Sequence, residues 1–435
     1  MKLKRAGAAL SLAAILALTG ICVSLNSSSV RQEEVPEVPV RLNEVIANDT
    51  ADIPGLRGMD AAIEKYMAYW RLRGVSLSIM RNDSLLLSRG YGWADKEEGV
   101  KMSPAFIMRV ASVSKLLTAT AIMKLQEDGR LHLKDTVFGP SGILRDTAYT
   151  SVMKDPMYNL ITVEDLLRHK GGFTASGGDP MFSTRTIMLQ NHLDTPPDNI
   201  ELMRIYLRRR LRFRPGTSQY YSNFGYLLLS KIVEEVSGLD YETYMRDSVL
   251  VPAGCFDMHI ARNYYEERYP GEVKYYNGAD TLLVEEFNNS GRLVERCYGG
   301  SDIRSLSGAG AWVTSTPELA RFVASIDGRP EVPDIISRES VAAMTEWFDP
   351  ETYSLGWNDT KPTGEWTRTG TLSGTSALVK YYPDGECWIM VTNTSTWKGP
   401  GFTNYTASLF KRLRERYSAA LPVRDLFHEQ PYDTE

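Results

Sequence analysis

Strand-like segments stand at the two ends of this chain and leave a long, mainly helical stretch between them. Residues 75–80 and 84–91 show the apolar and β-branched pattern of two strands joined by a tight turn. Residues 366–393 hold further short strands, broken where Gly, Ser, Pro and Asp interrupt the pattern. We therefore expect the ends of the chain to meet in one antiparallel sheet, with the helical middle beside it.

Helical periodicity flanks the strands and fills the middle of the chain. Ile63, Tyr66 and Trp70 fall at helical spacing before the first strand, and Phe410 and Leu413 do so after the last. The expected fold class is α/β, in the α+β arrangement: an antiparallel sheet flanked by N- and C-terminal helices, plus a mainly helical subdomain. The expected helices cover residues 59–73, 112–127, 162–169, 222–238 and 404–419.

The start of the chain predicts export. Residues 1–25 combine a basic beginning with an uncharged run over 6–25, which is the pattern of an export signal or membrane anchor. Three fates stay open: cleavage after a small residue such as Ser24, lipidation of Cys22, or retention as an anchor, since a membrane span needs about 20 apolar residues. In each case the body of the protein is expected in the periplasm or cell envelope, with possible attachment to the membrane through its N-terminus.

Composition places the rest of the chain among folded proteins with a sizeable core. The protein has 435 residues, of which 43% are hydrophobic and 24% charged. Residues 26–54 are polar and contain prolines, so we expect a linker there. Residues 55–421 are expected to form one catalytic domain, followed by a solvent-exposed tail at 422–435.

Charge and metal-ligand patterns exclude two classes of function. The net charge is −5, and Lys and Arg show no basic stripe or tail, so no nucleic-acid partner is expected. The five His residues are dispersed without the spacing of metal ligands, so neither a metal nor another cofactor is expected. Cys255 and Cys297 could form a disulfide or remain buried free thiols, and Cys387 leaves the count odd.

A Ser-x-x-Lys pattern is the first sign of chemistry. It occurs three times, at Ser112/Lys115, Ser151/Lys154 and Ser395/Lys398. Proline follows soon after the second and third copies and disfavours a continuing helix there. The first copy opens a long apolar helix, so its two side chains share a face and the amine can reach the hydroxyl. A serine at a helix N-terminus also lies where N–H groups stabilise an oxyanion.

Two further motifs lie downstream of the Ser112 copy. Tyr221 and Asn223 stand where a loop enters a helix. The phenol of Tyr221 can relay a proton there, and the amide of Asn223 can bond both a substrate and an amine. On an expected strand, Arg368, Thr369 and Gly370, with Thr371 after them, combine a cation, a hydroxyl and a glycine. That set suits close docking of an extended substrate and recognition of a carboxylate.

Together these motifs resemble the serine β-lactamase and penicillin-binding-protein superfamily, most nearly the branch of class C β-lactamases, D,D-carboxypeptidases and esterases. The order Ser-x-x-Lys, Tyr-x-Asn and basic-x-Gly is the family's order, and the similarity extends over residues 58–418. The resemblance implies a serine hydrolase without a cofactor, acting on a small molecule or peptide such as a peptidoglycan peptide, β-lactam, amide or ester. We expect a monomer.

The resemblance also implies roles for the individual residues. Ser112 would form an acyl-enzyme with Lys115 as general base, and Tyr221 would shuttle protons. Asn223 would bind the substrate amide, and the backbone N–H groups of Ser112 and Thr371 would form the oxyanion hole. The family usually has Lys or His where this chain has Arg368, and arginine keeps the charge but cannot act as a base.

Three other interpretations compete with a serine hydrolase of this type. In a Ser-His-Asp hydrolase His169 would be the base, although no Gly-x-Ser-x-Gly elbow occurs. In a membrane-tethered penicillin-binding or sensor protein, Ser112 would be acylated without turnover. A degenerate scaffold would lack one of the three motifs, and all three are filled here.

Overall fold

The computed structural model describes residues 41–49, 52–53, 55–175, 178–278 and 283–428. These residues belong to one compact unit, Val40–Glu435. The predicted export signal or anchor at 1–25 and the first part of the expected linker lie outside the described residues. Within the described residues, no helix has both the length and the apolar character needed to cross a membrane.

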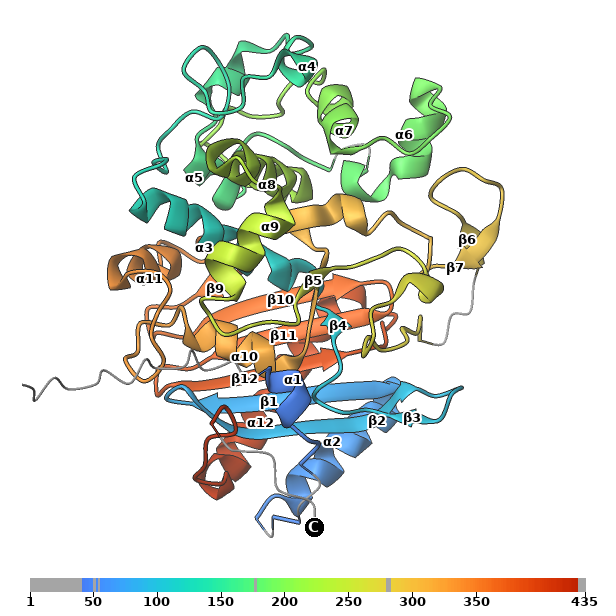
Figure 1. Cartoon of the computed structure of the whole chain (residues 1–435), viewed down its shortest axis with the longest axis vertical. Helices are drawn as coiled ribbons and strands as arrows, with labels where there is room; N and C mark the ends of the chain where they lie inside the picture. The colour runs from blue at the N-terminus through green and yellow to red at the C-terminus, as the bar shows by residue number, and fades with distance from the viewer. Residues whose placement is uncertain (1–40, 50–51, 54, 176–177, 279–282, 429–435) are drawn as a thin grey trace, which may run out of the picture. The chain divides into compact units, whose positions relative to one another are not determined.

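One antiparallel sheet joins the two ends of the chain, as the sequence predicted (Figure 1). Strand β1 pairs with β2 on one side and with β12 on the other, with Val75 opposite Thr392 and Arg81 opposite Glu386. The order across the sheet is β3-β2-β1-β12-β11-β10-β9. Its strands are β1 (Gly74–Arg81), β2 (Ser84–Asp95), β3 (Val100–Lys101), β9 (Asp359–Thr360), β10 (Trp366–Leu372), β11 (Thr375–Tyr381) and β12 (Glu386–Thr392).

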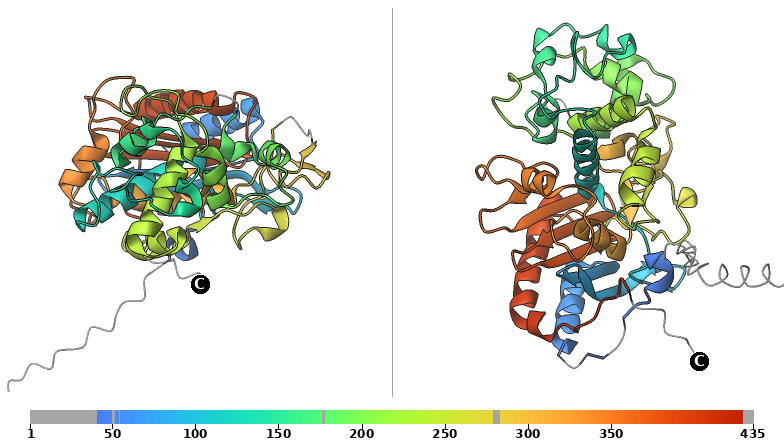
Figure 2. Two further views of the ribbon diagram at one scale, coloured as in Figure 1. Left: turned by 90° about the horizontal axis from the view of Figure 1, so that it is seen from above. Right: turned by 60° about the vertical axis from the view of Figure 1, so that its left-hand side comes forward.

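Side chains alternate between the two faces of the sheet, and each face is covered by helices. Val75 and Ile79 of β1 pack in the apolar layer under α2 (Arg57–Trp70) and α12 (Phe402–Tyr417), which lie on the same side of the sheet in Figure 2. Ser76 points the other way and shares a 2.7 Å hydrogen bond with Thr316, the first residue of α10 (Thr316–Ala324). This period of two is what half-buried strands require.

The middle of the chain is mainly helical, also as predicted, and includes two small sheets. Strand β8 (Trp312–Thr314) pairs with β4 (Met108–Arg109) and β5 (His259–Ile260), and β6 (Leu283–Glu285) pairs with β7 (Leu293–Glu295). The remaining helices are α1 (Leu42–Val45), α3 (Ser114–Glu127), α4 (Thr147–Thr150), α5 (Val163–Leu167), α6 (Thr184–Asn191), α7 (Asn199–Tyr206), α8 (Asn223–Ser237), α9 (Tyr241–Met245) and α11 (Arg338–Thr345).

Local sequence signals account for the ends of the helices that carry the site. Ser222 caps α8 by accepting a hydrogen bond from the N–H of Gly225, and Gly238 ends the helix in the left-handed conformation. Thr162 and Asp165 form the reciprocal capping box that the sequence predicted for α5. Helix α3 begins later than expected, at Ser114, because residues 111–113 form a separate 3₁₀ turn.

The expected linker and tail both need correction. Residues 41–49 belong to the fold: Leu42 and Ile46 are buried, and Asn43 donates a 2.9 Å hydrogen bond to Asp257. The tail is only partly solvent-exposed up to His428: Val423 is exposed, but the segment runs beside β2 and Phe427 is buried. The Leu426 N–H bonds the Leu85 carbonyl at 2.9 Å. The polar composition of these segments predicted exposure. The backbone N–H and C=O groups of β2 beside the tail need hydrogen-bond partners, and the sequence pattern does not reveal that the tail supplies them.

Of the two alternatives left open for Cys255 and Cys297, the structure shows buried free thiols and not a disulfide, and Cys387 is also free and buried. Basic residues are also less scattered than expected: five arginines fall within residues 208–214, and three of them line a cavity of about 560 Å³.

A truncation tests the corrected position of the tail. Ending the chain after Leu421 removes the hydrogen bonds that Arg424 and Asp425 make to β2, together with the buried ring of Phe427. We expect the free energy of unfolding to fall by about 3 kcal/mol, measured by urea denaturation. A chain ending after His428 is the control; equal stability of the two truncated chains would contradict the packed tail.

Candidate active site

The candidate nucleophile stands on a strained turn between a strand and a helix. Ala111 has a φ of +50°, a conformation that costs a residue other than glycine about 1–2 kcal/mol. The Ser114 hydroxyl holds this turn by donating a 2.6 Å hydrogen bond to the Ala111 carbonyl. The turn places Ser112 just before α3, so its side chain is not locked into the helix.

Lys115, three residues on, is completely buried beside Ser112. Its Nζ lies 3.3 Å from Ser112 Oγ and 2.7 Å from Asn223 Oδ1, and it also bonds the carbonyl of Ala309. These acceptors come from the nucleophile turn, from α8 and from the segment before β8. The sequence predicted the first two partners and did not assign the third.

This set of partners directs a neutral Lys115 towards the serine. An ammonium has three N–H donors and would use one for each acceptor. A neutral amine keeps two N–H donors, which Asn223 and the Ala309 carbonyl accept, and its lone pair then points at Ser112. The pKa of Lys115 is lowered to about 8: burial is the main cause, the nearby charge of Arg368 acts in the same direction, and Tyr221 opposes both.

Tyr221 is the second group in contact with the nucleophile. Its hydroxyl donates a 2.8 Å hydrogen bond to Ser112 Oγ. Burial raises the pKa of Tyr221, but the positive charges of Lys115 and Arg368 outweigh burial, so the net pKa lies below the usual value. A phenol of lowered pKa that touches the serine can both take and return a proton.

Arg368 lies differently from the substrate-binding cation that the sequence suggested. Its Nε and Nη2 donate hydrogen bonds of 2.8 and 2.5 Å to the backbone carbonyl of Ser112. The side chain is completely buried, whereas direct recognition of a substrate carboxylate requires an accessible guanidinium. In this structure Arg368 holds the nucleophile turn and adds positive charge near Lys115 and Tyr221.

Strand β10 approaches the nucleophile turn closely at Gly370. A Cβ there would lie 2.1 Å from the Val110 carbonyl oxygen and 3.1 Å from the Ser112 backbone nitrogen, so only glycine fits. Thr371, the next residue, lines a cleft of about 460 Å³ together with Ser301 and Trp397. The close approach explains why a glycine is needed in this motif.

Thr369 faces another partner that the sequence analysis missed. Its backbone N–H and its hydroxyl both bond Asn358 Oδ1, at 2.7 and 3.0 Å. Asn358 therefore fixes the edge of β10 beside the site. The structure gives Thr369 a role in holding the strand, where the sequence had suggested a substrate contact.

Asn223 joins Lys115 to an acidic residue. Its Oδ1 accepts from Lys115, while its Nδ2 donates a 2.7 Å hydrogen bond to Asp179 Oδ2. Asp179 therefore sets which end of the amide faces the lysine. It also means that the amide N–H₂, expected to bind substrate, already has an acceptor. No pattern in the sequence pointed to Asp179, since it contacts Asn223 only through the fold.

His169, the base of the rival triad, supports Tyr221 instead of contacting the serine. Its Nδ1 accepts a 3.2 Å hydrogen bond from the Ser222 N–H, and its ring centroid lies 4.4 Å from that of Tyr221. Burial and the charges of Lys115 and Arg368 hold the pKa of His169 well below its usual value, so the ring is neutral. The geometry does not form a Ser-His-Asp triad.

The two other Ser-x-x-Lys copies lie in ordinary structural settings. Ser151 follows the end of the short helix α4. Ser395 lies in the loop after β12, where the Lys398 ammonium stands 4.1 Å from the centre of the Trp397 ring. The 3₁₀ turn at 399–401 and α12 begin only after Lys398, so neither copy places its serine and lysine on one helical turn, which agrees with the choice of Ser112. Among the residues described here, no group of His, Cys, Asp and Glu has a metal-binding arrangement.

Comparison with known proteins agrees with this geometry. The sequence matches the Beta-lactamase family over residues 59–412. The "Putative penicillin-binding protein PbpX" of Bacillus subtilis (strain 168) is 25% identical over 330 residues, covering 76% of this chain and 72% of that protein.

Two solved structures share the fold. A penicillin-binding protein homologue from Pyrococcus abyssi has a TM-score of 0.61 and 24% identity, covering 84% of this chain and 79% of its own. The D-amino acid amidase of Ochrobactrum anthropi SV3, complexed with L-phenylalanine, has a TM-score of 0.64 and 18% identity, covering 84% and 99%.

The fold and the Ser-Lys-Tyr arrangement thus define a β-lactamase-like serine hydrolase fold. The chain belongs to the Beta-lactamase family, which confirms the predicted family and the predicted fold class.

Replacing Asp179 by Asn tests its link to Lys115. The negative charge of Asp179 raises the pKa of Lys115, so its removal should lower that pKa below about 8. The pH at which the acylation rate is half-maximal should then move down, because the amine loses its proton at lower pH. The measurement is the pH dependence of labelling by a fluorophosphonate.

The control for this substitution is Asp198→Asn. Asp198 caps α7 and bonds the Glu201 N–H, so the change is chemically identical but lies in another helix. We expect its pH dependence to match that of the parent protein. A midpoint that stays unchanged in Asp179→Asn would remove Asp179 from the account.

Proposed function

We propose that the protein is an exported serine hydrolase that transfers an acyl group through an ester on Ser112. The observation that carries this proposal is that one hydroxyl, Ser112 Oγ, lies within hydrogen-bond reach of both the buried Lys115 amine and the Tyr221 phenol. A serine becomes a nucleophile only when an adjacent group takes its proton, and both candidates are in place.

Acylation follows from these contacts. Ser112 Oγ attacks the substrate carbonyl carbon while its proton passes to the neutral Lys115 amine. The backbone N–H groups of Ser112 and Thr371 are proposed to bond the resulting oxyanion. As the tetrahedral centre collapses, its bond to the leaving group breaks and Tyr221 donates a proton to that group. Lys115 restores the proton of Tyr221, and the acyl group stays on Ser112.

Deacylation uses the same groups, with the direction of the proton transfers reversed. Tyr221, held against His169, first passes its phenol proton to the neutral Lys115 amine, and the resulting phenolate takes a proton from water, whose oxygen attacks the ester carbonyl. The Ser112–carbonyl bond then breaks, and Lys115 returns its proton to the serine oxygen. Arg368 cannot accept a proton, so its part is to keep the Ser112 carbonyl in place and to favour the deprotonated forms of its neighbours.

The proposed substrates are amides and esters, with peptidoglycan peptides first among them. The basic, then apolar start of the chain supports a location in the periplasm or cell envelope, where such peptides occur. Solved relatives of the fold include a D-amino acid amidase complexed with L-phenylalanine amide, which supports amide substrates. We propose that the enzyme works as a monomer without a metal or other cofactor, on a small molecule or peptide.

Covalent labelling tests the nucleophile and the base. A fluorophosphonate or fluorescent penicillin should label the purified protein at Ser112, and the Ser112→Ala variant should not be labelled. Lys115→Ala should slow labelling by about 10² to 10⁴, as the loss of a general base does. Mass spectrometry after trypsin digestion identifies the modified residue.

Ser395→Ala is the matched control, because it removes the serine of another Ser-x-x-Lys copy. It should label as the parent does. Equal labelling of Ser112→Ala would refute the assignment. Release of product over many cycles from muropeptides, D-amino-acid amides or short-chain esters is expected; a single acyl group per chain with no further release would indicate a sensor instead of a hydrolase.

A further inference from the structure

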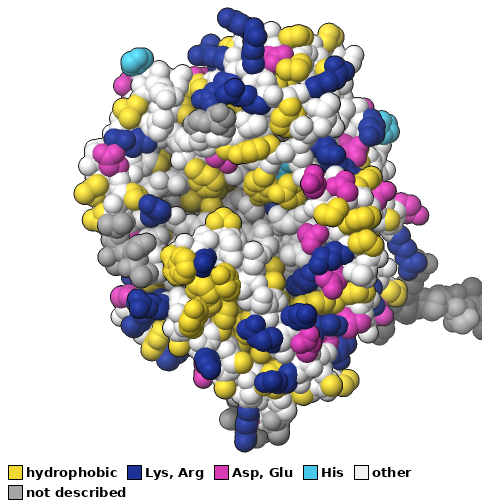
Figure 3. All heavy atoms as spheres, turned by 180° about the vertical axis from the view of Figure 1, so that it is seen from behind, with side chains coloured by type: hydrophobic (Ala, Val, Ile, Leu, Met, Phe, Trp, Pro, Cys, Tyr) yellow, Lys and Arg dark blue, Asp and Glu magenta, His cyan; other side chains and the backbone are white. Residues whose placement is uncertain are grey.

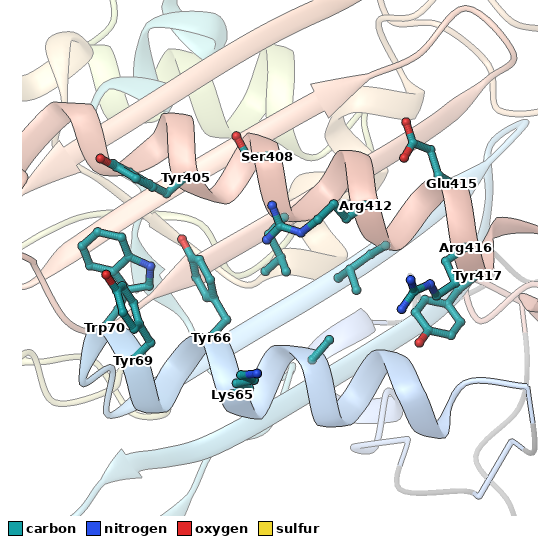
Figure 4. A pocket seen from close by; sticks show the side chains of 13 residues that line it. Lys65, Tyr66, Tyr69, Trp70, Tyr405, Ser408, Arg412, Glu415, Arg416 and Tyr417 are labelled. Carbon is teal, nitrogen blue, oxygen red and sulfur yellow. The ribbon is translucent and has the colours of Figure 1, made fainter.

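A long groove runs between α2 and α12 on the outer side of the sheet, away from the catalytic residues (Figure 4). We call it the α2/α12 groove; it has a volume of about 810 Å³, and Tyr69, Trp70, Tyr405, Arg412 and Arg416 are among its lining residues. None of its residues takes part in the proposed chemistry. Figure 3 shows this side of the molecule, where hydrophobic and basic side chains lie next to one another.

One end of the groove is an aromatic surface that the solvent reaches. Tyr69 is 77% exposed and Tyr405 is 42% exposed, while Trp70 stands between them with ring centroids 5.2 and 4.8 Å away. Figure 4 shows the three rings gathered at one end. Exposed aromatic side chains in a cluster are typical of a binding surface, because a monomer gains nothing by leaving them in water.

The groove is also lined by cations without partners. Lys65 belongs to α2, and Arg412 and Arg416 belong to α12. Within the described part of the chain, none of the three forms an ion pair, and the neighbouring Glu415 is paired with Lys411. Arginine side chains with free donors match carboxylate oxygens in charge and geometry.

The aromatic end of the groove lies close to the cleft that Thr371 lines. Trp397, which is 76% exposed, lines that cleft together with Thr371. Its ring centroid lies 6.2 Å from that of Trp70 in the α2/α12 groove. We infer that an extended ligand passes over these two rings, with its reacting group near Ser112 and the rest of its length along the groove.

We propose that the α2/α12 groove binds the polysaccharide part of the substrate, a strand of N-acetylated amino sugars that carries peptides ending in carboxylates. The inference rests on the proposed function for the choice of peptidoglycan. The C–H faces of sugar rings pack on the electron-rich faces of aromatic rings, and Tyr69, Trp70 and Tyr405 supply such faces. Arg412 and Arg416 then meet the carboxylates of a neighbouring peptide.

The form of this surface favours a polymer strand over a lipid surface. A bilayer is flat on the scale of one domain and meets side chains that project outward. Here the aromatic and basic side chains line a groove between two helices, and Glu415 lies among them. A strand enters such a groove, and a flat surface does not.

Binding to purified peptidoglycan tests the proposal without relying on catalysis. The full chain carrying Ser112→Ala is titrated with soluble peptide-bearing glycan fragments of several disaccharide units, by calorimetry. Adding Tyr69→Ala and Tyr405→Ala together should weaken binding at least tenfold. Adding Arg412→Gln and Arg416→Gln should also weaken it and should reduce its dependence on salt.

Matched controls replace exposed residues outside the groove. Trp347→Ala removes an aromatic ring that is 42% exposed, and Arg338→Gln removes an exposed cation of α11. Both should bind as the Ser112→Ala parent does. In chains that keep Ser112, Tyr69→Ala with Tyr405→Ala should leave the hydrolysis of a short D-amino-acid amide unchanged and slow the hydrolysis of polymeric substrate.

Three results would overturn the proposal: no binding of glycan by the parent, equal binding by both groove variants, or binding of phosphatidylglycerol vesicles but not glycan. The outcome is separate from that of the proposed function. Groove-dependent glycan binding by the Ser112→Ala chain, together with no labelling of Ser112 in the chain that keeps it, would support the groove and contradict the hydrolase. Acylation of Ser112 without glycan binding would support the hydrolase and contradict the groove.

Discussion

The burial of one amine, Lys115 Nζ, is the constraint on which the rest of the site depends. Taking an ammonium out of water costs several kcal/mol unless its donors are all satisfied. Ser112, Asn223 and the Ala309 carbonyl satisfy them from three separate segments of the chain. The shift of the Lys115 pKa from 10.5 to about 8 corresponds to about 3 kcal/mol against the charged form. That penalty is present below pH 8 and disappears as the pH rises past 10.5.

The sheet brings the other half of the site to this amine. Because β1 pairs with β12, the C-terminal strands lie beside the N-terminal hairpin, and β10 reaches the nucleophile turn. Gly370 permits the close approach of β10 to this turn, and Arg368 stabilises it by donating hydrogen bonds to the Ser112 carbonyl. The strained backbone at Ala111 is kept in place by these contacts, next to the serine.

Much of this could be predicted from the sequence, since its signals are local. The period-two strands, the capping box at Thr162 and the helix that follows Ser112 are each read within a few residues. The order of the three motifs along the chain, which is the family's order, then predicted that Ser112, Lys115 and Tyr221 are neighbours. The structure confirms that these three side chains meet.

What the sequence could not show depends on contacts between distant segments. Strand alternation places Arg368 on a face of β10 but does not say that its guanidinium bonds a backbone carbonyl. Asp179 acts through one hydrogen bond with Asn223, and Asn358 through two with Thr369 on β10; nothing in the neighbourhood of either residue in the sequence marks it. The sequence offered His169 as the base of a rival triad, and only its packing against Tyr221 shows that the ring supports the phenol instead.

The most direct test of the account is the ionisation of Lys115 itself. A nuclear magnetic resonance titration of protein labelled with ¹³C at lysine Cε, with Lys115→Arg used to assign the signal, reports the pKa of this one amine. The account predicts a midpoint near pH 8 in the folded protein. A midpoint near 10.5, the ordinary value for lysine, would mean that the amine is fully charged at neutral pH, and would contradict its role as the base.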